Sequence, residues 1–545
     1  MKKTERHHQP PPPMFSTSKR ADERQALAIA QRALSADPDV LDIHLGYRFK
    51  NGWITDERVV VVELRQKLSP LEVRTTRRDL VPSRFGRLGV DVRTGGLAIQ
   101  LADLGLDLEE LEAPSKGGQY REPKHLTLAP VEERMQAVFH VSPDAGFPTL
   151  KKFLGRVKSH LTATIYEWEP THISTAIEEA MEGTGKTLTM VTMPHFGIAQ
   201  GTQDAVADMR KRIGKKFKHV FASVGYGKLI PSAYHIKVAS RDGEEFWLSS
   251  GNWKDSNQAD INPAGEHSTD PAPLLKHNRE WHAVIANPTL ADLFQRYVEF
   301  DFDEAKRLPF TKGPAAAFPD VFVPEAAFFQ KEVRGAVRYF EPLELDQVLE
   351  IQPLLTPDRD SNQKHIFVKF ATELAESAMR RILVENQSFS IGEQQEYEEL
   401  FSTLIKKQRD GIDVRIIFRD PRQFPRGAET LQRTLEKVKE FGFDMGHVKV
   451  QKNCHTKGII VDSEQVILGS QNLTPAGSLF NRDASLLVRD ANVASYFEKI
   501  FEFDWDHLAA QEAEEAVGGI RIAKPGEPTP AGFRRVSVSE LLSQD

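Results

Sequence analysis

An internal repeat constrains the fold of this chain more than any other feature of its sequence. The pattern H-x-K-x-x-x-x-D occurs as HIKVASRD at 235–242 and again as HTKGIIVD at 455–462. Each copy is followed by S-x-N, at 250–252 and at 470–472, and one offset of 220 positions relates all of these residues. Self-similarity at a fixed spacing predicts two copies of one structural module.

The repeat extends beyond the two motifs. ADLFQRYVEFDFD at 291–303 matches ASYFEKIFEFDWD at 494–506, with an offset of 203. Helical patterns such as PTHISTAIEEAMEG alternate with buried-strand patterns such as TLTMVTM, which is typical of layered α/β proteins. The fold class is therefore predicted to be α/β, with two tandem α/β modules at 134–330 and 331–510. A pseudo-two-fold axis is expected to relate them.

The remaining sequence divides into four further segments. A chain of 545 residues is too long for one core, since single cores stop growing at roughly 250–300 residues. Residues 1–20 are polar and proline-rich, so they are predicted to be disordered. A helical pattern and then strand patterns around an Asn-Gly turn predict a small α/β domain at 21–95, of unknown role. Residues 96–133 are predicted to be a linker, and 511–545 a loose C-terminal tail.

The composition favours a globular protein of the cytoplasm. Charged residues make up 27% and the net charge is −7, so the chain as a whole is not a polycation that coats nucleic acid. The charged N-terminus is not followed by an apolar stretch, which argues against a signal peptide. No apolar run is long enough to predict a transmembrane segment. Cys454 is the only cysteine, so a disulfide within the chain is excluded.

Each motif is predicted to form strand–turn–strand. Residues two apart on a strand point to the same face, so the histidine and the lysine of a motif project together. The asparagine of S-x-N joins them from the adjacent strand or its end. The side chains gathered in this way are His235, Lys237 and Asn252 in the first copy, and His455, Lys457 and Asn472 in the second.

These side chains suit chemistry on a phosphodiester. Lysine and asparagine donate hydrogen bonds to the non-bridging phosphate oxygens and to the charge that grows on them in the transition state. A neutral imidazole can attack phosphorus and form a phosphohistidine, while a second, protonated imidazole gives its proton to the leaving oxygen. The motifs lack the carboxylate clusters of a two-metal phosphodiesterase, so no metal and no cofactor are predicted.

The pair of motifs resembles the phospholipase D superfamily, which includes phospholipases, cardiolipin synthases, endonucleases and tyrosyl-DNA phosphodiesterase. The resemblance covers residues 134–510 and implies that His235 is the nucleophile and His455 the general acid. It also implies an acidic residue beyond each motif that orients the histidine of the opposite half, a place matched by NREW and NRDA. Glu280 is then expected to orient His455, and Asp483 to orient His235, by accepting from imidazole Nδ1.

Four further residues are expected to support the site. Asp242 and Asp462 close their motifs and are predicted to cap the turn or to hold strands together, rather than to take part in the chemistry. Ser250 and Ser470 begin the S-x-N pattern. The first copy departs from the second by an insertion, NQADINPAGEHSTDPAPLLKH, which is predicted to form a loop over the site.

Three functions remain open. The first is a phospholipase D-like enzyme that hydrolyses phospholipid headgroup esters or transfers the phosphatidyl group to an alcohol. The second is an endonuclease that acts on DNA or RNA with the same residues. The third is an inactive binding or scaffold module, which is disfavoured because neither motif is degraded. The modest negative net charge slightly favours a phospholipid or a small diester.

The phosphodiester substrate is the one partner that the sequence requires. Both half-sites lie in one chain, so no dimer is needed for activity. The basic run MRKRIGKKFKH at 209–219 is either a solvated helix face or a contact for anionic lipid headgroups or nucleic-acid phosphates, which leaves peripheral membrane contact open. Cys454 adjoins His455, but neighbours on a strand face opposite ways, so a buried structural thiol is predicted.

Overall fold

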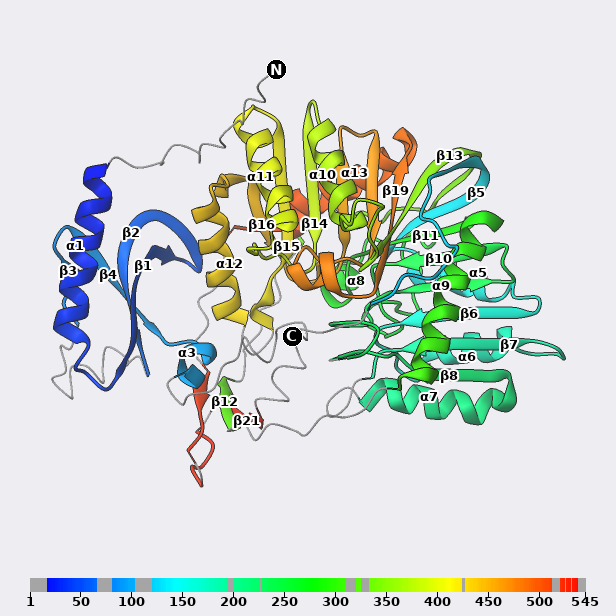
Figure 1. Cartoon of the computed structure of the whole chain (residues 1–545), viewed down its shortest axis with the longest axis horizontal. Coiled ribbons are helices and arrows are strands. Elements are labelled where there is room, and N and C mark those ends of the chain that lie inside the picture. Colours follow the sequence, from blue (N-terminus) through cyan, green and yellow to red (C-terminus); the bar gives the residue numbers. More distant parts are fainter. Residues whose placement is uncertain are drawn as a thin grey trace, which may run out of the picture. The chain divides into compact units, whose positions relative to one another are not determined.

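The computed structural model describes most of the chain. The described residues are 17–65, 81–102, 120–194, 200–225, 227–309, 320–324, 333–423, 427–511, 520–524, 526–530 and 532–537. They separate into two compact units, of which the first takes in residues 1–109, 319–325 and 512–536, and the second takes in 110–318, 326–511 and 537–545. Figure 1 labels the elements of both units.

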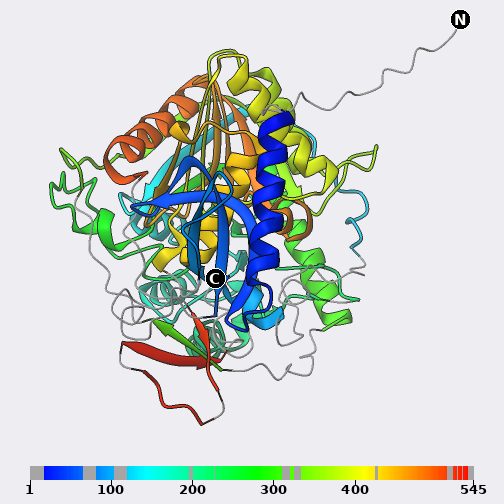
Figure 2. The same ribbon diagram turned by 90° about the vertical axis from the view of Figure 1, so that its left-hand side faces the viewer.

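A helix packed on a four-stranded sheet forms the core of the first unit (Figure 2). Its elements are α1 (Thr17–Leu34), β1 (Val40–Lys50), β2 (Trp53–Leu64), β3 (Arg84–Phe85) and β4 (Leu88–Thr94), in the strand order β1-β2-β4-β3. Ala26 of the helix belongs to one buried cluster with Val60 and Val62, which share a face because they lie two apart on β2. Asn51 and Gly52 have positive φ (50° and 68°) and make the β1–β2 turn that their sequence predicts.

Three short strands and a short helix complete the first unit. They are α3 (Leu97–Ala102), β12 (Asp320–Pro324), β20 (Arg521–Ile522) and β21 (Phe533–Ser537), with the strand order β20-β12-β21. Gln100 of α3 donates to the carbonyl oxygens of Gly95 (2.6 Å) and Ile520 (2.7 Å).

These elements differ from the expected linker and loose tail. The segment 96–133 holds α3, and the segment 511–545 holds β20 and β21. Strands this short show no periodicity in the sequence. Their partner β12 lies far away in the chain, so local reasoning does not find the pairing. Residues 1–16, most of the segment predicted to be disordered, lie outside the described residues.

A 14-stranded mixed sheet forms the centre of the second unit. Half 1 contributes β5 (Val131–Ser142), β6 (His160–Ile165), β7 (Thr187–Thr192), β8 (Phe217–Phe221), β9 (Val238–Arg241), β10 (Glu245–Ser249) and β11 (Glu280–Ala286). Half 2 contributes β13 (Leu343–Thr356), β14 (Arg381–Asn386), β15 (Asp413–Arg419), β16 (Val448–Gln451), β17 (Lys457–Val461), β18 (Gln465–Gly469) and β19 (Asp483–Arg489).

The strand order reveals the pseudo-two-fold symmetry. It runs β16-β15-β14-β17-β18-β19-β13-β5-β11-β10-β9-β6-β7-β8, so the seven strands of half 2 mirror the seven of half 1 in reverse order. The halves meet at β13 and β5, which pair antiparallel, as a two-fold axis perpendicular to the strands requires. The prediction of two tandem α/β modules about a pseudo-two-fold axis, with a small N-terminal α/β domain, is confirmed.

Helices cover the sheet of the second unit (Figure 1). Half 1 carries α5 (Gly146–Leu154), α6 (His172–Ala180), α7 (Gln200–Ile213), η1 (Gly214–Lys216), α8 (Ala272–Lys276) and α9 (Pro288–Arg307). Half 2 carries α10 (Ile366–Ser377), α11 (Gln395–Arg409), η2 (Pro421–Gln423), α12 (Gly427–Phe441), η3 (Met445–His447), η4 (Ala476–Phe480), α13 (Ala491–Phe503) and η5 (Asp504–Leu508). Within the described part of the chain, none of the helices combines the length and apolar character needed to cross a membrane.

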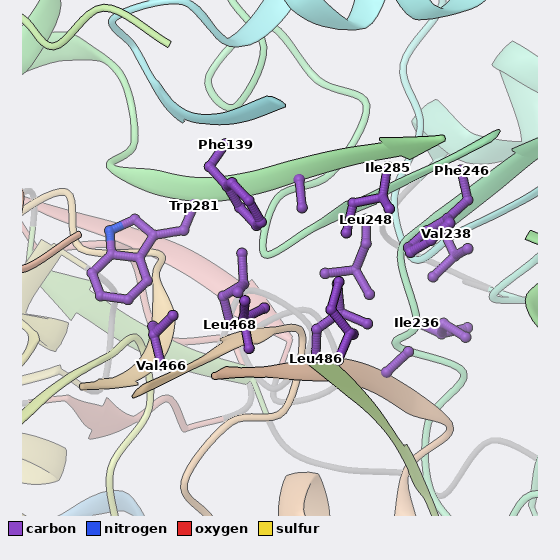
Figure 3. Close-up of a cluster of buried hydrophobic side chains, with 14 of the residues drawn as sticks. Phe139, Ile236, Val238, Phe246, Leu248, Trp281, Ile285, Val466, Leu468 and Leu486 are labelled. Carbon is purple, nitrogen blue, oxygen red and sulfur yellow. The ribbon is translucent and has the colours of Figure 1, made fainter. Parts of the chain in front are cut away.

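One buried cluster joins the two halves. It contains Phe294 of α9 and Phe497 of α13 together with strand residues from both halves. Figure 3 shows Trp281 of half 1 above Val466 and Leu468 of half 2. Because this apolar core is shared, the two half-sites are held by one packed body rather than by two that merely touch.

Candidate active site

The predicted strand–turn–strand forms from the later residues of each motif, as β9 and β10 in the first copy and β17 and β18 in the second, each pair antiparallel. The prediction placed the histidines on the first strand, but His235 and Lys237 precede β9, and His455 precedes β17. The turns place Asp242 and Asp462 at positive φ, 56° and 55°, a region that aspartate tolerates better than most residues.

The motif aspartates hold backbone, as their supporting role requires. The Asp242 carboxylate accepts from the N–H groups of Lys158 (2.9 Å), Ser159 (2.8 Å) and His160 (2.9 Å). The Asp462 carboxylate accepts from those of Met379 (2.7 Å), Arg380 (2.8 Å) and Arg381 (2.8 Å). Burial raises the pKa of Asp242, but these donors outweigh it and lower the value to about 2. Each aspartate thereby fixes the start of the neighbouring strand, β6 or β14.

Each histidine contacts an acid of the opposite half. His235 Nδ1 lies 2.8 Å from Asp483 Oδ1, and His455 Nδ1 lies 3.1 Å from Glu280 Oε1. The two acids are the first residues of β19 and β11, which are equivalent strands of the repeat. With Nδ1 facing a carboxylate, the Nε2 of His235 is left for chemistry. The His455 ring also contacts Lys457 Nζ, which lies 3.1 Å from its Nδ1 and 3.5 Å from its Nε2.

Burial sets the charge of both imidazoles. His235 is 7% exposed and His455 is 5% exposed. Loss of water, reinforced by Lys237, lowers the pKa of His235 to about 4. Burial, reinforced by Lys457, lowers the pKa of His455 well below its usual value. Both shifts favour the neutral ring in the free site, and a bound phosphodiester anion would raise the pKa of either ring.

Glu280 is buried among apolar and cationic groups. Burial raises the pKa of its carboxyl to about 8, although nearby Lys457 opposes the shift. Asn257, from the insertion of the first copy, donates to Glu280 Oε1. Glu280 can therefore hold a proton near neutral pH, next to the ring that is proposed to supply one.

The two lysines lie in one shared environment. Lys457 Nζ donates to Gln387 Oε1 (2.6 Å) and to the carbonyl oxygen of Ser250 (3.2 Å), which belongs to the opposite half. Lys237 Nζ lies 5.3 Å from the centre of the Tyr166 ring. Burial lowers the pKa of Lys237 to about 8. Burial and then the charge of Lys237 lower the pKa of Lys457, so the two ammonium groups sense each other.

The asparagines occupy different settings. Asn252 Nδ2 donates to Glu167 Oε2 at 3.2 Å, so a bound phosphate would compete with Glu167 for this donor. Asn472 Oδ1 is buried and has no hydrogen-bond partner among the described residues. Its backbone carbonyl accepts from Ser478 Oγ at 3.0 Å.

The serines of S-x-N tie each motif to the strand that carries the acid. Ser250 Oγ accepts from the backbone N–H of Trp281 at 3.0 Å. Ser470 Oγ accepts from the backbone N–H of Ala484 at 3.1 Å and donates to Asp483 Oδ1. Gly251 follows Ser250, and a Cβ placed there would lie 1.2 Å from Glu280 Oε2. Only glycine fits at this position beside the acid.

Several neighbours of the site escaped the sequence prediction. The Tyr166 ring stands edge-on to the His235 ring, with 4.7 Å between centres. Gln387, which binds Lys457, occupies the equivalent place in half 2, since Tyr166 follows β6 and Gln387 follows β14. Residues just beyond the ends of buried strands often line ligand sites in open α/β sheets, and this position was the available signal.

The geometry thus gathers both histidines, both lysines and both partner acids in one place. Their catalytic roles stay predictions. Among the described residues, no group of three or more His, Cys, Asp or Glu side chains is arranged to hold a metal ion. Cys454 is fully buried, as predicted for a structural thiol, and burial raises its pKa.

Comparison with known proteins finds a family likeness in the second half of the chain. The family model for "Cardiolipin synthase, PLD-like domain" matches residues 372–505, which carry the second motif and its acid. Over these residues the chain is similar to the phospholipase D-like domain that the model describes. Cardiolipin synthase A of Pseudomonas entomophila (strain L48) is 23% identical over 297 residues, 54% of this chain and 51% of that protein. The chain therefore spans about half the length of this curated relative.

Two solved structures are among those that match this chain. Phosphatidylserine synthase of Haemophilus influenzae Rd KW20 is 12% identical, with a TM-score of 0.45, and the match covers 69% of this chain and 87% of that one. Nuc of Salmonella typhimurium, a phospholipase D family member, is 19% identical, with a TM-score of 0.24, and the match covers 29% of this chain and 97% of that one.

Proposed function

We propose that this chain is a metal-independent enzyme that cleaves phosphodiesters through a phosphohistidine. His235 Nε2 attacks phosphorus while the bond to the leaving oxygen breaks and His455 gives that oxygen a proton. In the second step His455 takes a proton from water or an alcohol as its oxygen attacks phosphorus, and the bond between phosphorus and nitrogen breaks. Water gives hydrolysis, and an alcohol gives transfer.

The crossed histidine–acid pairs carry this proposal. A neutral His235 with its Nδ1 facing Asp483 presents the Nε2 lone pair to phosphorus. His455 stands against Glu280, a carboxyl able to share a proton with it. Lys237 and Lys457 supply the positive charge that offsets the phosphate.

We further propose a phospholipid as the substrate, with transfer to an alcohol as an activity alongside hydrolysis. The support is the description of the matching family model and the name of the cardiolipin synthase relative. Nuclease activity would use the same residues, so it is the outcome that the assay must separate. An inactive scaffold is disfavoured because both histidine–acid pairs and both lysines are intact.

A substrate panel tests the proposed function. Purified protein is incubated with labelled phosphatidylglycerol and phosphatidylcholine, with and without glycerol, and with single-stranded DNA, duplex DNA and RNA. Phospholipid turnover that produces a glycerol adduct and survives EDTA is expected. Full loss with EDTA, restored by Mg²⁺ or Zn²⁺, would contradict the metal-independent mechanism. Cleavage of nucleic acid alone would replace phospholipid as the substrate. His235→Ala protein serves as the control for contaminating enzymes.

A further inference from the structure

Two buried arginines stand beside the site and have no part in the proposed chemistry. Arg279 directly precedes the partner acid Glu280, and Arg482 directly precedes Asp483, in the repeated sequence N-R-[E/D]. Arg279 is 1% exposed and Arg482 is 0% exposed. A guanidinium taken fully out of water is stable only when carboxylates and further acceptors surround it, so its partners reveal what it holds together.

Arg279 links half 1 to the histidine of half 2. Its Nε and Nη2 donate to the two oxygens of Asp504, at 2.8 and 3.0 Å, and its Nη1 donates to Asp144 at 2.5 Å. Its carbonyl oxygen accepts from the backbone N–H of His455 at 3.0 Å, and its own N–H donates to Asn453 at 2.8 Å. Asp504, Asn453 and His455 all belong to half 2.

Arg482 makes the equivalent contacts from half 2 to half 1. Its Nε and Nη2 donate to the two oxygens of Asp301, at 3.0 and 2.8 Å, and its Nη1 donates to Asp358 at 2.7 Å. Its carbonyl oxygen accepts from the backbone N–H of His235 at 2.8 Å, and its own N–H donates to Ala233 at 2.8 Å. Asp301, Ala233 and His235 all belong to half 1.

Each imidazole is therefore held at two points by one short stretch of the opposite half. The Arg279 carbonyl fixes the backbone of His455 while the next residue, Glu280, meets its ring. The Arg482 carbonyl and Asp483 do the same for His235. The two-pronged contact between guanidinium and carboxylate has a fixed geometry, so it locks the stretch against sliding.

We propose that Arg279 and Arg482 are positioning residues, each for the histidine of the opposite half, so that Arg279 aligns His455 and Arg482 aligns His235. This inference rests on the proposed function. It predicts different defects, because loosening Arg279 impairs protonation of the leaving group, whereas loosening Arg482 impairs attack on phosphorus. For Arg279, a purely structural role would instead slow both substrates alike. For Arg482, a purely structural role would reduce the fraction of active protein and leave the rate constant of adduct formation at His235 unchanged in the sites that remain.

The test weakens each arginine–aspartate contact between the halves by changing the aspartate and leaving the arginine as it is. Asp504→Asn and Asp301→Asn keep the side-chain size but remove the charge that faces Arg279 or Arg482 across the halves. Rates are measured on a phospholipid and on a p-nitrophenyl phosphodiester, whose leaving group needs little protonation. Glu498→Gln, which alters a partly exposed ion pair with Arg381 inside half 2, is the matched control.

Asp504→Asn is expected to lower turnover of the phospholipid about 10-fold or more, a smaller loss than the roughly 10²–10⁴-fold loss that follows removal of a general acid. The rate on the p-nitrophenyl diester is expected to stay at the wild-type value. Asp301→Asn is expected to lower both rates by the same factor and to lower the single-turnover rate constant of adduct formation at His235, measured per active site. Equal factors for both substrates with Asp504→Asn, or wild-type rates with either variant, would overturn the inference. If Asp504→Asn does not fold, Arg279→Lys replaces it in the test. Lysine keeps the positive charge but cannot donate two parallel hydrogen bonds to the carboxylate, so the same result is expected.

A different variant tests the proposed function separately from the positioning inference. His455→Ala must itself prefer the p-nitrophenyl diester. If it does not, the assigned roles of the histidines are wrong whatever the aspartate variants do. If it does, and Asp504→Asn shows no such preference, the histidine roles stand and only the positioning inference is wrong.

Discussion

At the scale of single residues, the two histidines are unequal in the proposed reaction. His235→Ala lacks the nucleophile, so no adduct can form with any substrate. His455→Ala lacks only the proton donor, a loss of roughly 10²–10⁴-fold on a phospholipid. A p-nitrophenyl diester should therefore restore much of the rate of His455→Ala and none of the rate of His235→Ala. The double variant should be little worse than His235→Ala, because residues that act as a unit are not additive.

Trapping the intermediate checks this assignment directly. Turnover is stopped without acid, and the digested protein is analysed by mass spectrometry for a phosphorylated peptide. The adduct is expected on the peptide that holds His235. An adduct found on His455 and never on His235 would reverse the two roles. The absence of any adduct while turnover is fast would count against covalent catalysis.

Lys237 gives the site a dependence on pH. Burial lowers its pKa to about 8, so the ammonium is charged below that pH and loses its charge as the pH rises through it. Lys237→Arg keeps its charge throughout, because arginine does not titrate in this range. The ratio of kcat/KM for Lys237→Arg to that of wild type should therefore rise above pH 8, even if it is small at pH 7.

Lys254 provides the control for this pH profile. It lies 3.1 Å from Glu167, and its pKa is raised because that carboxylate and Glu169 outweigh the effect of burial. Lys254→Arg should give a ratio to wild type that stays flat between pH 7 and about 9, since both side chains keep their charge. A flat ratio for Lys237→Arg as well would show that Lys237 does not lose its proton there.

At the scale of elements, the connection between β10 and β11 decides where Glu280 stands. Gly251→Ala would place a methyl group where Glu280 Oε2 lies, at 1.2 Å, so the acid must move away from His455. A displacement of this size should lower kcat by about 10²-fold. Gly155→Ala is the control, because its nearest neighbour would lie at 3.4 Å, an ordinary contact. Wild-type kcat for Gly251→Ala would show that Glu280 does not orient His455.

Elements with a repeated or periodic sequence were predictable. The strand–turn–strand of each motif and the Asn51–Gly52 hairpin follow from side-chain alternation and turn chemistry. Strands β20 and β21 were not, since two to five residues show no period and their partner is remote in the chain. The roles of Arg279 and Arg482 were also missed. Both arginines lie in the repeated N-R sequence, but only the folded chain brings Asp504 and Asp301 into contact with them.

At the scale of the whole molecule, the site depends on both halves of one chain. The offset of 220 positions predicted two modules, and the need for two imidazoles at one phosphate predicted the axis between them. The sequence could not show that the halves share one continuous sheet through β5 and β13, because pairing across more than 200 residues leaves no local pattern. That continuous sheet fixes the spacing between the half-sites.

The contacts within one chain make a prediction about mixtures of inactive proteins. His235→Ala and His455→Ala, unfolded together in urea and refolded as an equal mixture, should show no phospholipid turnover beyond that of either alone. Each chain pairs its own His235 with its own Asp483, and its own His455 with its own Glu280, so every site keeps the one defect of its chain. If each site were instead built from halves of two chains, random pairing would restore roughly a quarter of the wild-type rate. Such recovery would contradict the single-chain site, and wild-type protein carried through the same refolding controls for losses.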